Sequence, residues 1–194
     1  MGTSPKMNFS PSLEGRRNRE NRRGELYDET KSMVCKKVNA SYRIIGLMEM
    51  RMEASIILNC SNYSDNIIDI LKLFQQIGWD IYNPQGETEY LPIGDDYEFD
   101  WQCEKITEIK LFDIVSEKVA KKELIGVNLF YNNGVEGISL LADTTEQVML
   151  SISINRKISK GKYTDMIWYL ENIIYKFFDI GIRLLSYRLE EYED

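Results

Sequence analysis

Residues 124–154 read LIGVNLFYNNGVEGISLLADTTEQVMLSISI, and this stretch decides the fold. Its three apolar runs are separated by two turn sequences, Asn132-Asn133-Gly134 and the residues around Asp143. In the last run every second residue from Val148 to Ile154 is aliphatic, whereas the residues between them are Met or Ser. This alternation places the aliphatic side chains on one face of a strand. The stretch therefore predicts a three-stranded antiparallel meander with one buried face.

The flanking segments supply helices and further strands. Residues 54–60 predict a strand, and the helix that follows is expected to begin with Ser64 as its N-cap and to end at Gly78. Two more helices are predicted at about 106–119 and 164–180, and shorter strands at 79–82, 97–103 and 182–190. The stripe expected to face the core in the second helix is Ile106, Ile109, Phe112, Val115 and Val119. This order predicts an α+β fold, a mainly antiparallel sheet with about three helices packed on one face.

Net charge and hydrophobic patterning divide the chain into two segments. Residues 1–52 contain 11 Lys/Arg and 6 Asp/Glu, whereas residues 53–194 contain 13 Lys/Arg and 25 Asp/Glu. As far as Glu25 the chain shows no apolar periodicity, so it cannot bury enough apolar surface to offset its ordering entropy. We therefore expect residues 1–50 to be a basic extension, disordered or non-native, and residues 51–194 to form a single α+β domain.

The basic extension has three competing interpretations. An over-extended start is favoured, with the native protein beginning near Met48, Met50 or Met52, directly before the first strand. A solvated tail without a role comes next. A nucleic-acid-binding arm, suggested by the arginines between Arg16 and Arg23, is favoured least, and we expect no nucleic-acid partner because the larger segment is strongly acidic.

The composition excludes several classes of enzyme. Histidine is absent, and the cysteines Cys35, Cys60 and Cys103 lie far apart. The chain alone therefore offers no Ser–His–Asp or Cys–His arrangement, no histidine-based zinc site and no disulfide framework. No apolar run approaches the roughly 18 to 20 residues that span a bilayer. We expect a cytoplasmic protein that is not an enzyme, with no catalytic residues, cofactor, metal site or membrane contact.

The most distinctive local feature is the acidic run Asp95-Asp96-Tyr97-Glu98-Phe99-Asp100. If the run is extended, Asp96, Glu98 and Asp100 project from one face of a strand. Such a set can form the solvated face of an edge strand, dock a basic partner, or hold Mg²⁺ or Ca²⁺ through oxygen ligands. The solvated strand is favoured of the three. The acidic residues assigned to partner binding are Asp95, Asp96, Glu98 and Asp100.

Two sequence patterns suggest a catalytic site, but a structural role explains each of them better. Asp96 followed by Glu108-Ile109-Lys110 matches a metal-dependent nuclease pattern, but the apolar spacing places this triplet on a helix. Cys60 lies between a strand end and a helix start, where a thiolate is stabilised, but no histidine can serve as its base. We predict that Cys60 is buried and inert.

The last helix carries more aromatic residues than one buried stripe can hold. These residues are Trp168, Tyr169, Tyr175 and Phe178. Two of them are expected on an exposed face, which would mark an interaction surface. Trp168 and Tyr169 are assigned to partner binding.

A resemblance rests on three segments, the meander Ile125–Ile154, the helix start Thr164–Leu170 and the ending Tyr187–Tyr192. In layout and composition, residues 52–194 resemble the small acidic immunity proteins of bacterial polymorphic-toxin and contact-dependent inhibition systems. The resemblance implies a protein that binds one cognate toxin tightly and blocks its active site or its import. The resemblance is one of layout and composition, so no functional residue of those families is assigned to a position in this chain.

Three functions follow in order of preference. The first is a non-catalytic protein that neutralises a cognate basic protein, such as an immunity protein that blocks a toxin. The second is a metal-dependent hydrolase or nuclease that uses the Asp95–Asp100 cluster. The third is a self-associating structural or regulatory module, a homodimer formed through exposed aromatics on helix 164–180 and an unpaired sheet edge.

Overall fold

The computed structural model describes residues 52–193. The predictions for residues 1–50 lie outside the described residues.

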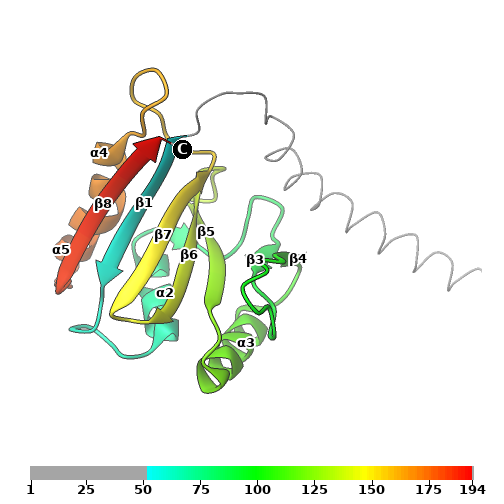
Figure 1. The fold of residues 1–194 in the computed structure, drawn as a ribbon. Coiled ribbons are helices and arrows are strands. Elements are labelled where there is room, and N and C mark those ends of the chain that lie inside the picture. Colours follow the sequence, from blue (N-terminus) through cyan, green and yellow to red (C-terminus); the bar gives the residue numbers. More distant parts are fainter. Residues whose placement is uncertain (1–51, 194) are drawn as a thin grey trace, which may run out of the picture. The chain divides into compact units, whose positions relative to one another are not determined.

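All the strands join into one antiparallel sheet (Figure 1). They are β1 (Met52–Asn59), β2 (Trp79–Asp80), β3 (Thr88–Tyr90), β4 (Gln102–Glu104), β5 (Ile125–Tyr131), β6 (Gly137–Thr144), β7 (Gln147–Ile154) and β8 (Ser186–Glu193). Their order across the sheet is β4-β3-β5-β6-β7-β1-β8, and β2 pairs with β5. Because β1 lies between β7 and β8, both ends of the described chain meet in the sheet.

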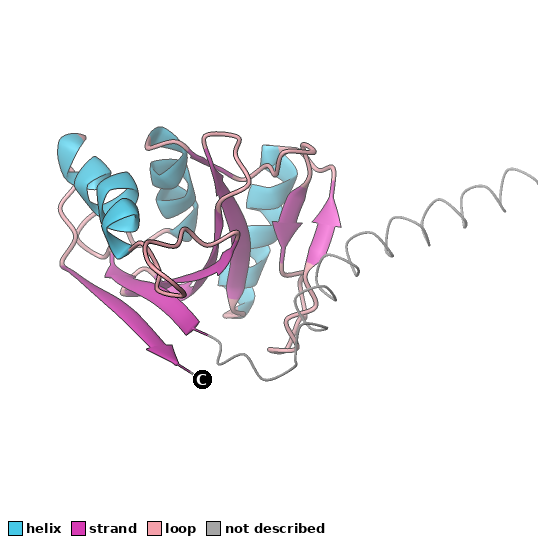
Figure 2. Ribbon diagram, turned by 90° about the horizontal axis from the view of Figure 1, so that it is seen from above, coloured by secondary structure: helices cyan, strands magenta, loops and turns pink. Residues whose placement is uncertain are grey.

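The helices cover one face of this sheet (Figure 2). They are α2 (Ile67–Gln76), α3 (Glu108–Lys121) and a C-terminal run made of α4 (Met166–Tyr169), the π-helical segment η1 (Leu170–Ile174) and α5 (Tyr175–Asp179). The predicted α+β class, an antiparallel sheet with helices on one face, is confirmed. None of the helices within residues 52–193 combines the length and the apolar character that crossing a membrane requires.

The meander β5-β6-β7 forms as the periodicity predicts. Val127 lies opposite Leu140, and Leu140 lies opposite Leu150, so the aliphatic side chains share one face. Asn132 and Asn133 have φ angles of +49° and +56°, in the left-handed region that asparagine adopts more readily than most residues. The turn chemistry of the sequence therefore fixes the first hairpin of the meander.

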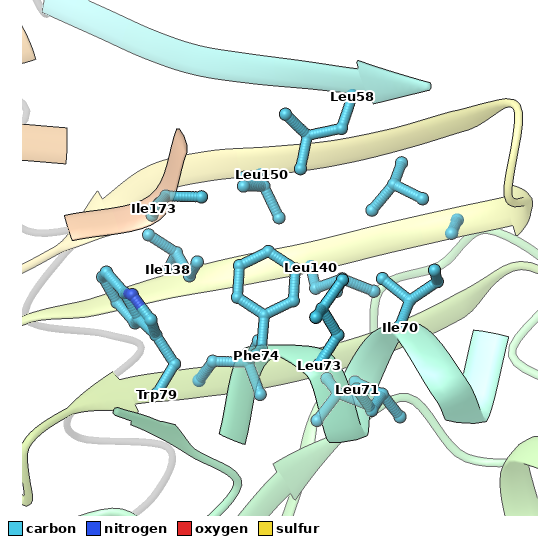
Figure 3. Close-up of a cluster of buried hydrophobic side chains, with 14 of the residues drawn as sticks. Leu58, Ile70, Leu71, Leu73, Phe74, Trp79, Ile138, Leu140, Leu150 and Ile173 are labelled. Carbon is cyan, nitrogen blue, oxygen red and sulfur yellow. The ribbon is translucent and has the colours of Figure 1, made fainter. Parts of the chain in front are cut away.

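The core fills the space between the sheet and the helices (Figure 3). Leu58 of β1, Leu140 of β6 and Leu150 of β7 point toward α2, and all three are fully buried. Phe74 of α2 meets Phe177 of α5 edge to face, with the ring centroids 5.2 Å apart. This geometry, which aromatic pairs prefer, joins the first helix to the last.

The opposite face of the sheet is polar where the central strands meet. Asn128, Ser139, Ser151 and Ser55 occupy neighbouring positions on β5, β6, β7 and β1, and Glu190 on β8 continues the row. Small polar side chains suit a sheet face that none of the helices in residues 52–193 covers (Figure 2).

Several element boundaries differ from the sequence predictions, three of them at the start of an element. The N-cap of α2 is Asn66 instead of Ser64, whose hydroxyl donates to Asp69. Helix α3 begins after Thr107, whose side chain accepts the Lys110 N–H, so Ile106 precedes the helix. The last strand begins at Ser186, later than the predicted 182.

The face of α3 that enters the core matches the prediction only in part. Ile109 is 74% exposed and Val119 is half exposed, whereas the buried residues are Leu111, Val115 and Lys118. Of the predicted stripe, Ile106 and Val115 are buried in the core and Phe112 packs against it, so the prediction is wrong only at Ile109 and Val119. The buried lysine, Lys118, belongs to the candidate site described below.

Candidate functional site: the acidic loop

Residues 91–101, here called the acidic loop, connect β3 to β4. The predicted strand over 97–103 is wrong except at its end, since residues 91–101 form turns and β4 covers only Gln102–Glu104. Tyr97 and Phe99 have φ angles of +60° and +56°, which no strand residue adopts. The alternation of aromatics and acids in this segment therefore does not reflect the two faces of a strand.

The base of the acidic loop packs on the side of β5 away from the helices. The Leu91 N–H donates to the Gly126 carbonyl at 2.9 Å. A Cβ atom at Gly126 would lie 2.6 Å from the Leu91 side chain and 3.1 Å from the Trp101 ring. A glycine at this position therefore lets both ends of the loop lie directly on the strand.

Two side chains at the C-terminal end of α3 hold the first half of the loop. The Lys118 side chain is 2% exposed, and its ammonium donates to the Pro92 carbonyl at 2.5 Å. It also pairs with Glu123 at 3.4 Å, and the Glu123 carboxylate accepts the Gly94 N–H at 2.7 Å. The Gly94 N–H, followed by Lys118, lowers the pKa of Glu123. The carboxylate is therefore charged at neutral pH, where it fixes the loop.

Asp95 holds the second half of the loop from within. Its carboxylate accepts the Phe99 N–H at 3.2 Å and the Asp100 N–H at 2.7 Å, and the residue is only 8% exposed. The assignment of Asp95 to partner binding is therefore corrected, because its oxygen atoms face the loop backbone. These bonds explain how Phe99 is kept in a left-handed conformation that costs energy.

The tip of the loop, residues 96–100, faces solvent. Asp96, Glu98 and Asp100 are exposed, as the sequence predicts for three of the four acidic site residues. Tyr97 and Phe99 are also exposed, by 61% and 45%. The sequence contains no Lys or Arg between residues 91 and 104. The structure thus brings together two aromatic rings and three carboxylates on a loop with fixed ends.

The aromatic residues of the C-terminal helix lie elsewhere than predicted. Tyr169 is fully buried, and its hydroxyl accepts the Lys157 N–H, so its assignment to partner binding is corrected. Burial raises the pKa of Tyr169. Trp168 is half buried against Trp79, with the ring centroids 6.0 Å apart. The two aromatics on the exposed face are Tyr175 and Phe178.

Sequence reasoning missed four residues that shape the site, Lys118, Glu123, Tyr97 and Phe99. The strand predicted over 97–103 left Tyr97 and Phe99 out of the site, and the contacts of Lys118 with Pro92 and of Glu123 with Gly94 join residues distant in sequence. Pro92 and Gly94 were the available signal, because they mark a turn before the acidic run.

Cys60 is buried, as predicted, and burial raises the pKa of its thiol to about 12. At pH 8 the reactive thiolate is then on the order of one molecule in ten thousand. We expect native Cys60 to resist iodoacetamide at this pH and to react once the chain is unfolded in guanidinium chloride. Peptide mass spectrometry measures both. Rapid labelling of the native chain at Cys60 would contradict the burial.

Within residues 52–193, no group of three or more His, Cys, Asp or Glu side chains is placed to hold a metal ion. Comparison of the chain with protein families, with characterised proteins and with solved structures gives no match.

Proposed function

We propose that this chain is a non-catalytic binding protein that neutralises a basic protein partner, in the manner of the immunity proteins that it resembles. The observation that carries the proposal is the tip of the acidic loop. It presents two exposed aromatic rings among three exposed carboxylates on a backbone held by Lys118 and Asp95.

The two kinds of side chain at the tip have different tasks. Tyr97 and Phe99 are the rings that a partner would desolvate, and buried aromatic side chains often dominate binding energy. Asp96, Glu98 and Asp100 would attract lysines and arginines, which raises the association rate and disfavours acidic partners. The combination fits a partner with an apolar pocket in a basic rim.

The fixed backbone supports binding by the loop as a preformed element. Ordering a loop upon association costs free energy, and this cost is small when the free protein already holds the bound conformation. The bonds from Lys118, Glu123 and Asp95 hold the loop on both sides of its tip, at Pro92, Gly94, Phe99 and Asp100. The tip residues therefore enter a complex with little further ordering.

The test is a pull-down with the full chain as bait, using lysate of the source organism and washes at low and high salt. The loop variant carries Asp96→Asn, Glu98→Gln and Asp100→Asn. The matched control carries Asp113→Asn, Glu117→Gln and Glu146→Gln, three exposed acids outside the loop, and so has the same net charge. We expect a basic protein that the wild-type and control baits retain at low salt and that the loop variant loses.

A second variant, Tyr97→Ala, separates the aromatic contribution from the charge. Once the partner is purified, calorimetry is expected to show a loss of about 2 kcal/mol, roughly thirtyfold in Kd, with little change in salt dependence. Co-expression then measures neutralisation of the partner's toxicity. Retention of the partner by the loop variant, or its equal loss from the control bait, contradicts the proposal.

A further inference from the structure

The C-terminal strand β8 forms one edge of the sheet. It pairs with β1 along its whole length, Met52 to Asn59 against Glu193 to Ser186, and no strand within residues 52–193 lies on its other side. The other edge strand, β4, covers only Gln102–Glu104. A long edge strand presents unpaired backbone groups, and these can pair with a further strand.

The charged side chains of β8 are mostly engaged within the chain. The Glu191 carboxylate accepts the Thr164 N–H at 2.6 Å, and Glu193 pairs with Lys162. Within residues 52–193, Arg188 and Glu190 form an ion pair with each other at 2.8 Å, and their side chains are 65% and 40% exposed. They are therefore the two charges at this edge that can change partner without breaking a contact elsewhere in the fold.

The sequence of β8 is complementary to itself in one register. When two copies of one strand pair antiparallel in a sheet, the twofold axis that relates them is perpendicular to the sheet. Residues opposite each other then lie on the same face of the sheet. The axis therefore passes midway between one residue and the same residue of the other copy. An axis at Arg188 or Glu190 would place that charge against its own copy. An axis at Leu189 places Leu189 against Leu189 and sets Arg188 opposite Glu190 twice.

The C-terminal helical run, α4, η1 and α5, lies beside this edge and exposes apolar side chains there (Figure 1). Trp79 donates to the Asn172 carbonyl, so the Trp168 and Asn172 flank of the helix faces the centre of the sheet. Ile167 and Phe178 of the same helical run are both exposed. On β8 itself, Tyr187 is also exposed on the helix side of the sheet, since it lies opposite Leu58.

We infer that β8 pairs with β8 of a second copy of this chain, antiparallel and centred on Leu189. The two sheets then form one continuous sheet, with Arg188 of each protomer against Glu190 of the other. The exposed flanks of the two C-terminal helices lie on the same side of the joint. The acidic loop is next to the opposite edge, at β3 and β4, and remains accessible in the dimer.

The experiment reverses the two charges separately and together in the full chain. Arg188→Glu and Glu190→Arg each place like charges across the joint, and each is expected to raise the dimer Kd by about tenfold at low salt. The double variant Arg188→Glu/Glu190→Arg restores both pairs and is expected to dimerise like the wild type. Sedimentation equilibrium measures the Kd values. Lys121→Glu, at an exposed ion pair on α3, is the control and is expected to change nothing.

Mixing the two single variants gives the sharpest result. Each cross-strand pair in a mixed dimer joins opposite charges, so native mass spectrometry is expected to find mixed dimers in excess over both homodimers. A wild-type chain that is monomeric at its highest soluble concentration overturns the inference. A dimer that neither reversal weakens, or a mixture without excess mixed dimer, also overturns it.

Cysteine cross-linking tests the register independently. Leu189→Cys lies on the axis and is expected to give a disulfide-linked dimer under mild oxidation, beyond the wild-type background. Tyr187→Cys is on the same face but opposite Glu191 of the other copy, and it is expected to give none. The reverse pattern overturns the Leu189 register.

Discussion

Trp79→Ala is expected to lower the free energy of unfolding by about 3–5 kcal/mol, the largest single effect in the core. The Trp79 ring is fully buried and contacts Tyr131 and Trp168, with ring centroids 5.2 and 6.0 Å away. Its Nε1–H donates to the Asn172 carbonyl at 3.0 Å. The substitution therefore removes a large apolar volume and a hydrogen bond where α2, β5 and the C-terminal helix meet. Small domains are stable by only about 5–15 kcal/mol, so the loss is a large share of the total.

Urea unfolding followed by circular dichroism measures this effect without relying on tryptophan emission. Trp79→Phe retains much of the volume but not the N–H donor, and an intermediate loss of about 1–2 kcal/mol is expected. Ile109→Ala, at an exposed position of α3, is the control and is expected to stay within about 0.5 kcal/mol of the wild type. A Trp79→Ala loss no larger than that of the control would contradict the packing described here.

Lys118→Ala is expected to lower the free energy of unfolding by about 2–3 kcal/mol and to loosen the acidic loop. The substitution leaves a space at a buried position and removes the donor to the Pro92 carbonyl and the partner of Glu123. Because Lys118 lies at the base of the loop and not at its tip, the tip side chains remain unchanged. The variant thus tests whether the helix fixes the loop.

Limited proteolysis with chymotrypsin reports on the loop directly, since Tyr97 and Phe99 are exposed cleavage sites. Cleavage at these residues is expected to be faster in Lys118→Ala than in the wild type under native conditions. Lys121→Ala removes an exposed lysine from the same helix and is expected to change neither cleavage nor stability. Equal cleavage in Lys118→Ala and the wild type would show that Lys118 does not hold the loop.

The sequence predicted the central sheet well because its signals are local. Alternating aliphatic residues and the turn at Asn132-Asn133-Gly134 act within one hairpin, and the register follows from them. The alternation of Tyr97, Phe99 and Trp101 looked similar but did not give a strand. There the conformation depends on contacts distant in sequence, such as that of Lys118 with Pro92, which no local pattern reports.

In the C-terminal helix, too, local sequence patterns did not predict which side chains are buried. The sequence indicated that two of its aromatic residues would be exposed, and two are, but they are Tyr175 and Phe178. Trp168 and Tyr169 are drawn into a cluster with Trp79 and Tyr131, which come from other parts of the chain. Composition thus gave the number of exposed aromatics, whereas tertiary packing decided which residues they are.

The place of β1 in the sheet has a consequence for how the protein folds. β1 is the first described strand to leave the ribosome, but its partners β7 and β8 follow about 95 and about 135 residues later. The meander β5-β6-β7 joins strands that are close in sequence, so it can form during synthesis. β1 must wait, with its apolar residues exposed, and such long-range pairing slows folding and favours aggregation of incomplete chains. β1 therefore acquires both of its neighbours only after the last strand has been made.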